Sequence, residues 1–218
     1  MKQYLVVGLG RFGGEVARAL AANGNRVVGI DGDPCKAQAM SDVLERVVTG
    51  DATEIDVLRE IGARNFDSAV VSVGTNLEAS VLITLNLKEL GVRKVMAKAC
   101  SDLHRKILSK VGADVVVFPE REAATKMAEA LVSDNILDVM ELGPECRIVE
   151  MVAGPKMAGK SLSQLRLRQQ FGVNVVAVKK DGMIDLSPQA DSRIEIGDVL
   201  VVIGPVTAVR NWKHQAES

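Results

Sequence analysis

The chain has 218 residues, 47% of them hydrophobic, which is enough apolar material for one or two buried domain cores. Aromatic residues make up only 3%, and the apolar volume comes mainly from Val, Leu, Ile and Ala, so a layered α/β fold is favoured over a β-sandwich. The formal net charge of -1 and the scattered basic residues argue against a nucleic-acid partner.

The sequence carries no pattern typical of a membrane span, a disulfide framework or a zinc site. Its most apolar stretch, residues 68–85, is interrupted by Asn76 and Glu78. The 3 cysteines are far apart in the sequence and odd in number, so we expect free thiols. These features favour a cytoplasmic chain.

Strand and helix patterns alternate regularly from the start of the chain to about residue 118. Strands with helical crossovers between them predict a Rossmann-type, doubly wound parallel sheet, with its third strand at an edge. The six expected strands are residues 4–8, 27–30, 46–49, 69–73, 94–98 and 114–118.

Local signals mark the ends of the helices between these strands. The pair Asp33-Pro34 is typical of a helix start, with Asp as N-cap and Pro as first residue. Residues 53–56 and 75–78 are predicted to form capping boxes. Helices are therefore expected at residues 11–23, from 34, at 53–62, 75–90 and 101–111.

After Pro119 the pattern changes. Residues 120–142 indicate a long amphipathic helical stretch interrupted near 133–135, which we interpret as a crossover. A small α+β domain is then expected, with strands at 147–152, 174–179, 183–186 and 199–203, a helix at 161–170 and a hairpin turn at 180–182. The predicted organisation is a nucleotide-binding domain at 1–132, a crossover helix and linker at 133–145, and a ligand-binding domain at 146–218.

Gly8, Gly10 and Gly13 form a G-x-G-x-x-G motif between the first strand and the first helix, and Asp31 follows at the end of the second strand. Gly8 permits the turn, Gly10 lets backbone approach a pyrophosphate, and Gly13 lets helix and strand pack closely. The helix start attracts phosphates, and Asp31 can accept hydrogen bonds from a ribose. The alternative is a tight turn without a ligand. The motif predicts a nucleotide but leaves NAD, ATP and ADP open.

Two charged residues bear on which nucleotide binds. Arg11 lies inside the predicted phosphate loop and could reach a terminal phosphate, although a solvated surface arginine is an equal alternative. Glu120 follows the sixth strand, where a carboxylate beside phosphates makes sense mainly with a bridging cation. The alternative for Glu120 is a carboxylate that stabilises a helix N-terminus.

Further polar residues lie just beyond strand ends or in the first turn of the next helix, so any of them could line the pocket: Asp51, Thr75, Asn76, Lys98 and His104. A dehydrogenase would also need a proton donor or acceptor in its second domain. The C-terminal region has no histidine before His214, no tyrosine and no suitable pair of carboxylates. The sequence therefore favours a binding protein over an enzyme.

The residues resemble the regulator-of-K+-conductance (RCK) family, specifically the KtrA-like and TrkA-like cytosolic subunits of bacterial K+ uptake systems. The likeness covers nearly the whole chain and is closer to KtrA, through GRFGG and the Pro-Glu-Arg segment. Its most specific pieces are VGLGRFGG at 7–14, GDAT at 50–53, KVGAD at 110–114, PER at 119–121 and the run from Lys160 through Gly172 to Val178.

The resemblance implies a homo-oligomeric ring of dimers, usually an octamer, docked under a KtrB- or TrkH-like membrane K+ translocation subunit at the inner face of the membrane. ATP and ADP would compete for one site, with NAD or NADH as the alternative. Arg11 would reach the γ-phosphate of a neighbour's ATP, and Glu120 would help to hold a cation (Mg²⁺, Ca²⁺ or Na⁺) between subunits. The implied nucleotide-binding residues are Gly8, Gly10, Arg11, Phe12, Gly13, Asp31, Gly32, Asp33, Asp51, Ala52, Val73, Gly74, Thr75, Asn76, Lys98, Ala99, Cys100, His104 and Glu120.

The C-terminal domain resembles the second ligand module of the family, which in some members binds cyclic di-AMP. Arg168, Asn174 and Val175 stand where those members contact it. Arg166 stands where such sensors carry an acidic residue, and the pair Gln169-Gln170 also departs from their pattern. Cyclic di-AMP binding therefore stays open.

Three functions follow from this sequence. The first is an ATP/ADP-sensing, non-enzymatic gating-ring subunit of a K+ transporter. The second is an NAD(H)-responsive regulator of the TrkA kind, which nucleotide competition would separate from the first. The third is an NAD-dependent oxidoreductase, which hydride transfer to a substrate would support.

Overall fold

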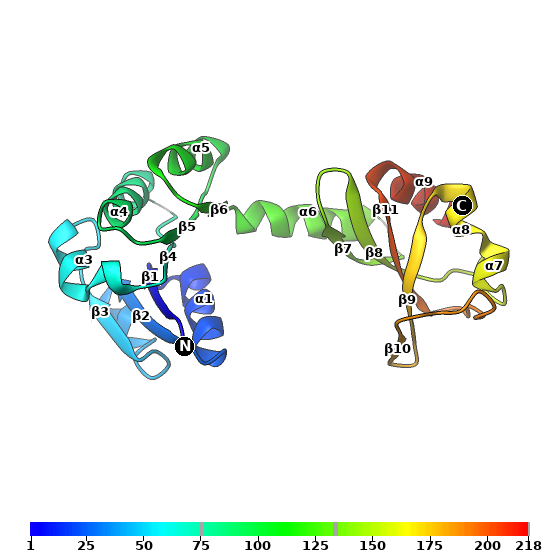
Figure 1. Cartoon of the computed structure of the whole chain (residues 1–218), viewed down its shortest axis with the longest axis horizontal. Helices are drawn as coiled ribbons and strands as arrows, with labels where there is room; N and C mark the ends of the chain where they lie inside the picture. The colour runs from blue at the N-terminus through cyan, green and yellow to red at the C-terminus, as the bar shows by residue number, and fades with distance from the viewer. Residues whose placement is uncertain (75, 133–134, 218) are drawn as a thin grey trace. The chain divides into compact units, whose positions relative to one another are not determined.

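A computed structural model of the chain describes residues 1–74, 76–132 and 135–217. The chain divides into two compact units, Met1–Arg121 and Glu122–Ser218 (Figure 1). The domain boundaries expected at residues 132 and 146 stay predictions.

The first unit is built on a six-stranded sheet in which every neighbouring pair is parallel. The strand order is β3-β2-β1-β4-β5-β6, so the chain starts in the middle of the sheet and reverses direction once. This confirms the doubly wound sheet and the edge position of its third strand. The strands are β1 (Gln3–Val7), β2 (Arg26–Asp31), β3 (Arg46–Thr49), β4 (Ser68–Val71), β5 (Lys94–Lys98) and β6 (Val115–Val117).

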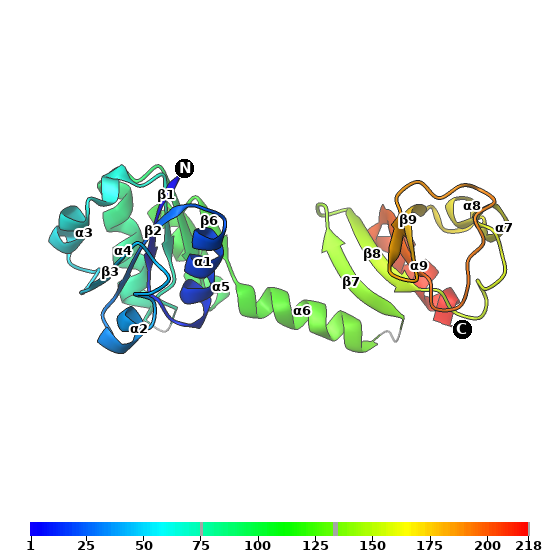
Figure 2. The same ribbon diagram turned by 90° about the horizontal axis from the view of Figure 1, so that it is seen from below.

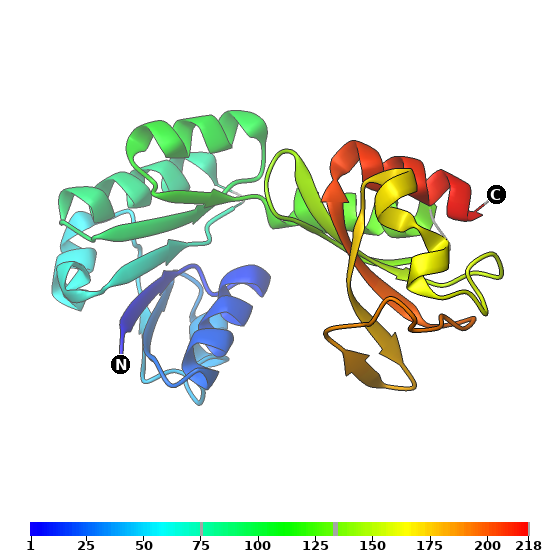
Figure 3. The same ribbon diagram turned by 45° about the vertical axis from the view of Figure 1, so that its right-hand side comes forward.

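Helices cover both faces of this sheet (Figure 3). On one face, α1 (Arg11–Ala22) and the segment after α2 (Pro34–Gln38) pack on β1 and β2 through Ala17, Met40 and Leu44. On the other face lies the larger core of the unit, to which α3 (Ile55–Ile61), the 3-10 helix η1 (Ala63–Asn65), α4 (Leu77–Glu89) and α5 (Asp102–Val111) contribute. Burial of both faces explains why these strands are short apolar runs without polar alternation.

Two of the predicted helix signals are confirmed. The Asp33 carboxylate accepts a hydrogen bond from the backbone N–H of Cys35, with Pro34 as the first residue of α2. Gly62 ends α3 in the left-handed conformation with a φ of 79°. Glycine reaches this conformation without the steric cost of a side chain.

Both predicted capping boxes are wrong. The Thr53 hydroxyl donates to Asp51 Oδ1 at 2.7 Å, so this side chain belongs to the turn after β3, and Glu54 is the N-cap of α3. Thr75 lies outside the described residues, and the N-cap of α4 is Asn76, which accepts from the Ala79 N–H at 3.0 Å. At Thr53, hydrogen bonding within the turn after β3 competes with the predicted cap.

The predicted crossover helix is wrong after residue 135. The helix α6 spans Pro119–Val132, and residues 136–141 form the strand β7 (Ile136–Glu141). A register shift between Ile136 and Asp138 inserts one extra residue, so Ile136 and Val139 are both buried although they are three residues apart. Because a spacing of three is also the helical spacing, the bulged strand imitates a helix in the sequence.

The second unit holds a five-stranded antiparallel sheet in the order β10-β9-β11-β8-β7. Figure 2 shows its strands β7, β8 and β9. Its core includes Met151, Ile194, Leu200 and Trp212. This confirms a separate, small α+β C-terminal domain. Its further elements are β8 (Cys146–Val152), α7 (Leu162–Leu165), α8 (Leu167–Phe171), β9 (Asn174–Lys180), β10 (Met183–Asp185), β11 (Val199–Pro205) and α9 (Val206–Glu217).

Two details of the second unit differ from the sequence prediction. The single helix expected at 161–170 is two short helices, because Arg166 adopts a left-handed conformation with φ 45° that an α-helix cannot continue. The helix α9 was not predicted. The expected hairpin turn is confirmed between β9 and β10, with positive φ at Asp181 and Gly182.

Candidate nucleotide-binding site

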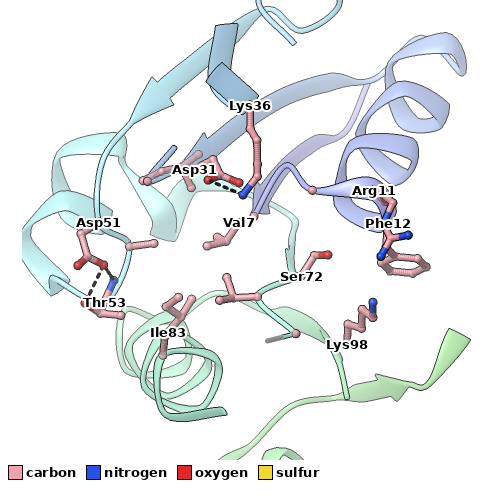
Figure 4. Close-up of a pocket in the computed structure, with 18 of the residues that line it drawn as sticks. Val7, Arg11, Phe12, Asp31, Lys36, Asp51, Thr53, Ser72, Ile83 and Lys98 are labelled. Atoms are coloured by element: carbon pink, nitrogen blue, oxygen red, sulfur yellow. Dashed lines mark hydrogen bonds and ion pairs between the residues drawn. The ribbon is translucent and has the colours of Figure 1, made fainter. Parts of the chain in front are cut away.

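A pocket of about 1170 Å³ opens at the carboxyl ends of the strands of the first unit. It lies where β1 and β4 are neighbours and their connections leave to opposite faces of the sheet. Ligands of open α/β sheets bind at such a reversal of strand order. In Figure 4, Asp51 and Thr53 lie on one side of the pocket and Arg11, Phe12 and Lys98 on the other, with Asp31 and Lys36 above.

The glycine loop is packed too tightly for side chains at two of its positions. A Cβ atom on Gly13 would lie 1.9 Å from the carbonyl oxygen of Gly8, and one on Gly8 would lie 2.9 Å from the carbonyl oxygen of Ser72. Gly8 also has a φ of 89°, which other residues rarely adopt. Both glycines therefore hold β1, β4 and α1 in close contact.

Gly10 differs from these two glycines because a Cβ atom there would meet nothing within 4 Å. Gly10 is the N-cap of α1 and offers no side-chain acceptor to the first backbone N–H groups of the helix. Because Gly10, Arg11 and Phe12 line the pocket, the helix start lies at its wall, and a helix start placed so is the arrangement that binds pyrophosphates.

Asp31 fixes the loop as well as lining the pocket. Its Oδ2 accepts from the Leu9 N–H at 2.7 Å, its Oδ1 accepts from the Asp33 N–H at 2.9 Å, and its side chain is only 12% exposed. Each carboxylate oxygen can accept a second hydrogen bond. The side chain is thus held in place with acceptor capacity left for a sugar diol.

Cationic groups gather on the side of the pocket near the start of α1. Lys98 Nζ lies 2.5 Å from Glu120 Oε1 and 5.6 Å from the centre of the Phe12 ring. The hydrogen bond from Lys98 lowers the pKa of Glu120, and the charge of Arg11 adds to this effect, so Glu120 is ionised at neutral pH. Within the described part of the chain, no ion pair is formed by Arg11.

Asp51 lies on the opposite side, in the turn after β3. Its Oδ1 accepts from both the N–H and the hydroxyl of Thr53, at 2.9 and 2.7 Å. These two bonds lower the pKa of Asp51. Its second oxygen remains able to accept from a ligand hydroxyl.

The pocket brings together most of the site residues expected from the sequence: Gly8, Gly10, Arg11, Phe12, Asp31, Gly32, Asp51, Ala52, Val73, Gly74, Lys98, Cys100 and Glu120. Thr75 lies outside the described residues. The remaining expected residues do not line the pocket, and their contact with a ligand stays a prediction: Gly13, Asp33, Asn76, Ala99 and His104.

His104 is fully buried in the first turn of α5, and its Nδ1 lies 3.3 Å from both the backbone N and the Sγ of Cys100. Burial lowers the pKa of His104, so the ring is neutral at pH 7. Asn76 and Asp33 are N-caps, and Gly13 serves the packing of the loop.

Sequence reasoning missed several lining residues, of which Lys36 is the most informative. Its Nζ lies 4.0 Å from Asp31 Oδ1 and 3.5 Å from Asp33 Oδ2, one helical turn after the end of β2. The sequence does carry a signal for Lys36, because it is a basic residue in the first turn of the helix that follows β2. The other missed residues are Val7, Glu15, Ile30, Thr49, Gly50, Thr53, Ser72, Ala79 and Ile83.

The part of the chain that the structure describes gathers few side chains suited to a cation. Among the described residues there is no group of three or more His, Cys, Asp or Glu side chains that could hold a metal ion. The carboxylate of Glu120 is already engaged by Lys98. The expected Mg²⁺, Ca²⁺ or Na⁺ therefore rests on the family resemblance alone.

The C-terminal candidates lie in the second unit. Arg168 is on the short helix α8, and Asn174 and Val175 start β9, where they pair with Ile203 and Val202 of β11. Their role in binding a ligand stays a prediction.

Comparison with known families decides the relationship. The TrkA-N domain matches residues 4–119 and the TrkA-C domain matches residues 146–212. The chain belongs to the KtrA/TrkA-like RCK family. It is 43% identical to Ktr system potassium uptake protein C of Bacillus subtilis, over 98% of this chain and 97% of that protein. It is 36% identical to Ktr system potassium uptake protein A of Bacillus subtilis, over 98% of this chain and 96% of that relative.

Solved structures show the same fold. The GsuK RCK domain superposes with a TM-score of 0.70 at 19% identity, covering 100% of this chain and 48% of that chain. This chain thus spans about half the length of that structure. The GsuK channel bound to NAD gives a TM-score of 0.65 at 18% identity, over 95% of this chain and 38% of that chain. No helix in the described residues is long and apolar enough to cross a membrane.

Proposed function

We propose that the chain is a nucleotide-sensing regulatory subunit of a Ktr- or Trk-type K+ uptake system, which binds a nucleotide without turning it over. The observation that carries the proposal is the pocket at the strand-order reversal. It combines an uncapped helix start at Gly10, a held carboxylate at Asp31 and cations at Arg11 and Lys98. These groups suit the phosphates and the ribose of one nucleotide.

ATP and ADP are the proposed ligands, and NAD(H) is the alternative. Arg11 is exposed at the first position of α1, lines the pocket and forms no ion pair among the described residues. An exposed guanidinium without an ion-pair partner can bind the γ-phosphate, which of these three nucleotides only ATP supplies. Against this, a solved channel of the same fold is bound to NAD.

The wider assembly is also proposed. Two relatives that this chain matches over nearly their whole length are named as proteins of a Ktr potassium uptake system. We infer a homo-oligomeric ring of dimers, an octamer, bound to a KtrB- or TrkH-like membrane subunit at the cytoplasmic face of the membrane. Co-purification with a co-expressed membrane subunit tests this, and a chain that stays monomeric and unbound would contradict it.

Titration calorimetry with ATP, ADP and NAD tests the ligand. Tight binding of ATP and ADP that NAD cannot displace supports the proposal, and NAD that displaces both favours the alternative. Hydride transfer from NADH to any substrate, which the oxidoreductase hypothesis requires, would overturn a purely regulatory function.

Asp31→Ala is expected to weaken the binding of ATP and of ADP equally, by about ten- to a hundredfold. The reason is that the ribose, which Asp31 would hold, is common to both nucleotides. Asp67→Ala is the matched control: Asp67 also accepts a backbone hydrogen bond, from the Gln3 N–H at 2.9 Å, at the other end of β1. Asp31→Ala loses two backbone hydrogen bonds and Asp67→Ala loses one, but only Asp31 lines the pocket. Calorimetry that finds a loss for one nucleotide only would contradict the assigned role of Asp31.

A further inference from the structure

Cys100 and His104 form a thiol–imidazole pair at the wall of the pocket. Cys100 is exposed and lines the pocket, whereas His104 behind it is 0% exposed. His104 Nδ1 lies 3.3 Å from Cys100 Sγ. A base beside an accessible thiol is the arrangement that activates a cysteine as a nucleophile.

The orientation of the imidazole is fixed by the backbone. Nδ1 accepts from the Cys100 N–H at 3.3 Å, which places the ring proton on Nε2. Nε2 is buried and has no hydrogen-bond partner among the described residues. Nδ1 has one lone pair, and the backbone N–H and the thiol of Cys100, both 3.3 Å from Nδ1, share it. A proton from the thiol can therefore be taken up when the long contact to the backbone N–H opens.

The start of α5 adds to this activation. Cys100 directly precedes Ser101, the N-cap of α5, whose hydroxyl accepts from the His104 N–H at 3.1 Å. A helix N-terminus stabilises negative charge on a nearby sulfur. The carboxylate of Asp102, which would oppose this charge, is paired with Arg121 at 2.5 and 2.8 Å.

We propose that Cys100 is a modification site that takes up small disulfides, and that the resulting mixed disulfide and a nucleotide exclude each other from the pocket. The exclusion rests on the proposed nucleotide-binding function, whereas the reactivity of the thiol does not. A group attached to Sγ projects into a pocket that already holds the glycine loop, Lys98 and Asp31 on its walls.

The chemistry is a thiol–disulfide exchange. Cys100 Sγ attacks one sulfur of the reagent, the bond between Sγ and that sulfur forms, and the S–S bond of the reagent breaks. The leaving sulfur departs as a thiolate with the electron pair. The thiol proton passes to His104 Nδ1 and then to the departing thiolate, so Cys100 is oxidised, the reagent is reduced, and no other oxidant is needed.

The chain contains its own control. Cys35 is also exposed and also lies at the start of a helix, α2, but the structure shows no imidazole beside it among the described residues. Its backbone N–H donates to Asp33 Oδ1 instead. A difference in rate between the two thiols therefore measures what His104 and the pocket contribute.

The first experiment treats the full chain with dithiodipyridine below stoichiometry and follows each cysteine by mass spectrometry. Cys100 is expected to react about tenfold faster than Cys35. His104→Gln should bring the two rates together if the variant folds. A wild-type chain in which Cys35 reacts as fast as Cys100 overturns the proposal, and this comparison needs no variant.

The second experiment repeats the reaction with saturating ADP and measures ADP binding by calorimetry before and after modification. ADP should slow the reaction of Cys100 and leave Cys35 unchanged, and the modified chain should bind ADP only after reduction. The Cys35→Ser chain should behave the same way.

If calorimetry finds ADP bound but Cys100 unprotected, mutual exclusion is wrong. If no nucleotide binds at all, the proposed function fails and exclusion with it, while the rate comparison still decides the reactivity of Cys100.

Discussion

Gly10→Ala is expected to weaken nucleotide binding by at least about a hundredfold while the chain keeps its thermal stability. Gly13→Ala is expected to lower the thermal stability of the chain and to lose nucleotide binding as a consequence. A Cβ atom on Gly10 meets no atom of the chain within 4 Å, so the fold tolerates it. That same space lies at the start of α1, where the phosphates must approach the backbone. The added methyl group would therefore clash with the ligand alone.

At Gly13 the added Cβ atom would lie 1.9 Å from the Gly8 carbonyl oxygen and 2.9 Å from Ser72 Cβ. Backbone on β1 or α1 must move to relieve these contacts, which costs about 3 kcal/mol of unfolding free energy or more. The Gly13→Ala chain would then bind nucleotide weakly because its glycine loop no longer has the native conformation.

Gly14→Ala is the matched control, because its Cβ atom would make ordinary contacts from 3.4 Å outward in the same helix. Thermal unfolding and calorimetry are measured on all three variants. Two outcomes would refute this account of the loop: a Gly10→Ala chain that binds ATP like the wild type, or a Gly13→Ala chain as stable as Gly14→Ala.

The sequence predicts the helices and strands of the first unit well because their signals lie in short stretches of sequence. Short apolar runs, an Asp-Pro helix start and a terminal glycine at Gly62 each depend on near neighbours only. The two capping boxes fail for local reasons, and the larger errors lie in the second unit. The strand β7 contains a bulge that matches a helical spacing, and only its pairing with β8 shows that it is a strand. The left-handed Arg166 carries no local signal at all, since it is neither glycine nor asparagine.

The same distinction holds for the site. The motif and the strand ends locate the pocket, because parallel strands place their carboxyl ends along one edge. They do not give the direction of a helical side chain. His104 follows a strand end as expected, yet the turn of α5 buries it behind Cys100 instead of placing it in the pocket. Lys36 was missed for the converse reason: its side chain reaches back from α2 toward Asp31.

Arg11 is the residue on which discrimination between ATP and ADP is expected to depend. It is the first residue of α1, it is exposed at the pocket, and within the described residues it has no ion-pair partner. Its charge contributes to the lowered pKa of Glu120, which places it in the same electrostatic environment as Lys98. Lys98, by contrast, already has its partner in Glu120.

Arg11→Ala should therefore weaken the binding of ATP by about 1.5 to 3 kcal/mol, which is the scale of a charge-assisted hydrogen bond. The affinity for ADP should change less than about twofold. Arg18→Ala is the matched control: it removes the same charge from the same helix, but Arg18 pairs with Glu15 at 2.9 Å and does not line the pocket. It should leave the ratio of ATP to ADP affinity unchanged.

Because a ligand shifts a conformational equilibrium only by its differential affinity for the two states, Arg11→Ala should also make a reconstituted transporter respond alike to both nucleotides. An Arg11→Ala chain that keeps the wild-type affinity ratio in calorimetry would show that the terminal phosphate is sensed by another group, and would make NAD(H) the stronger candidate.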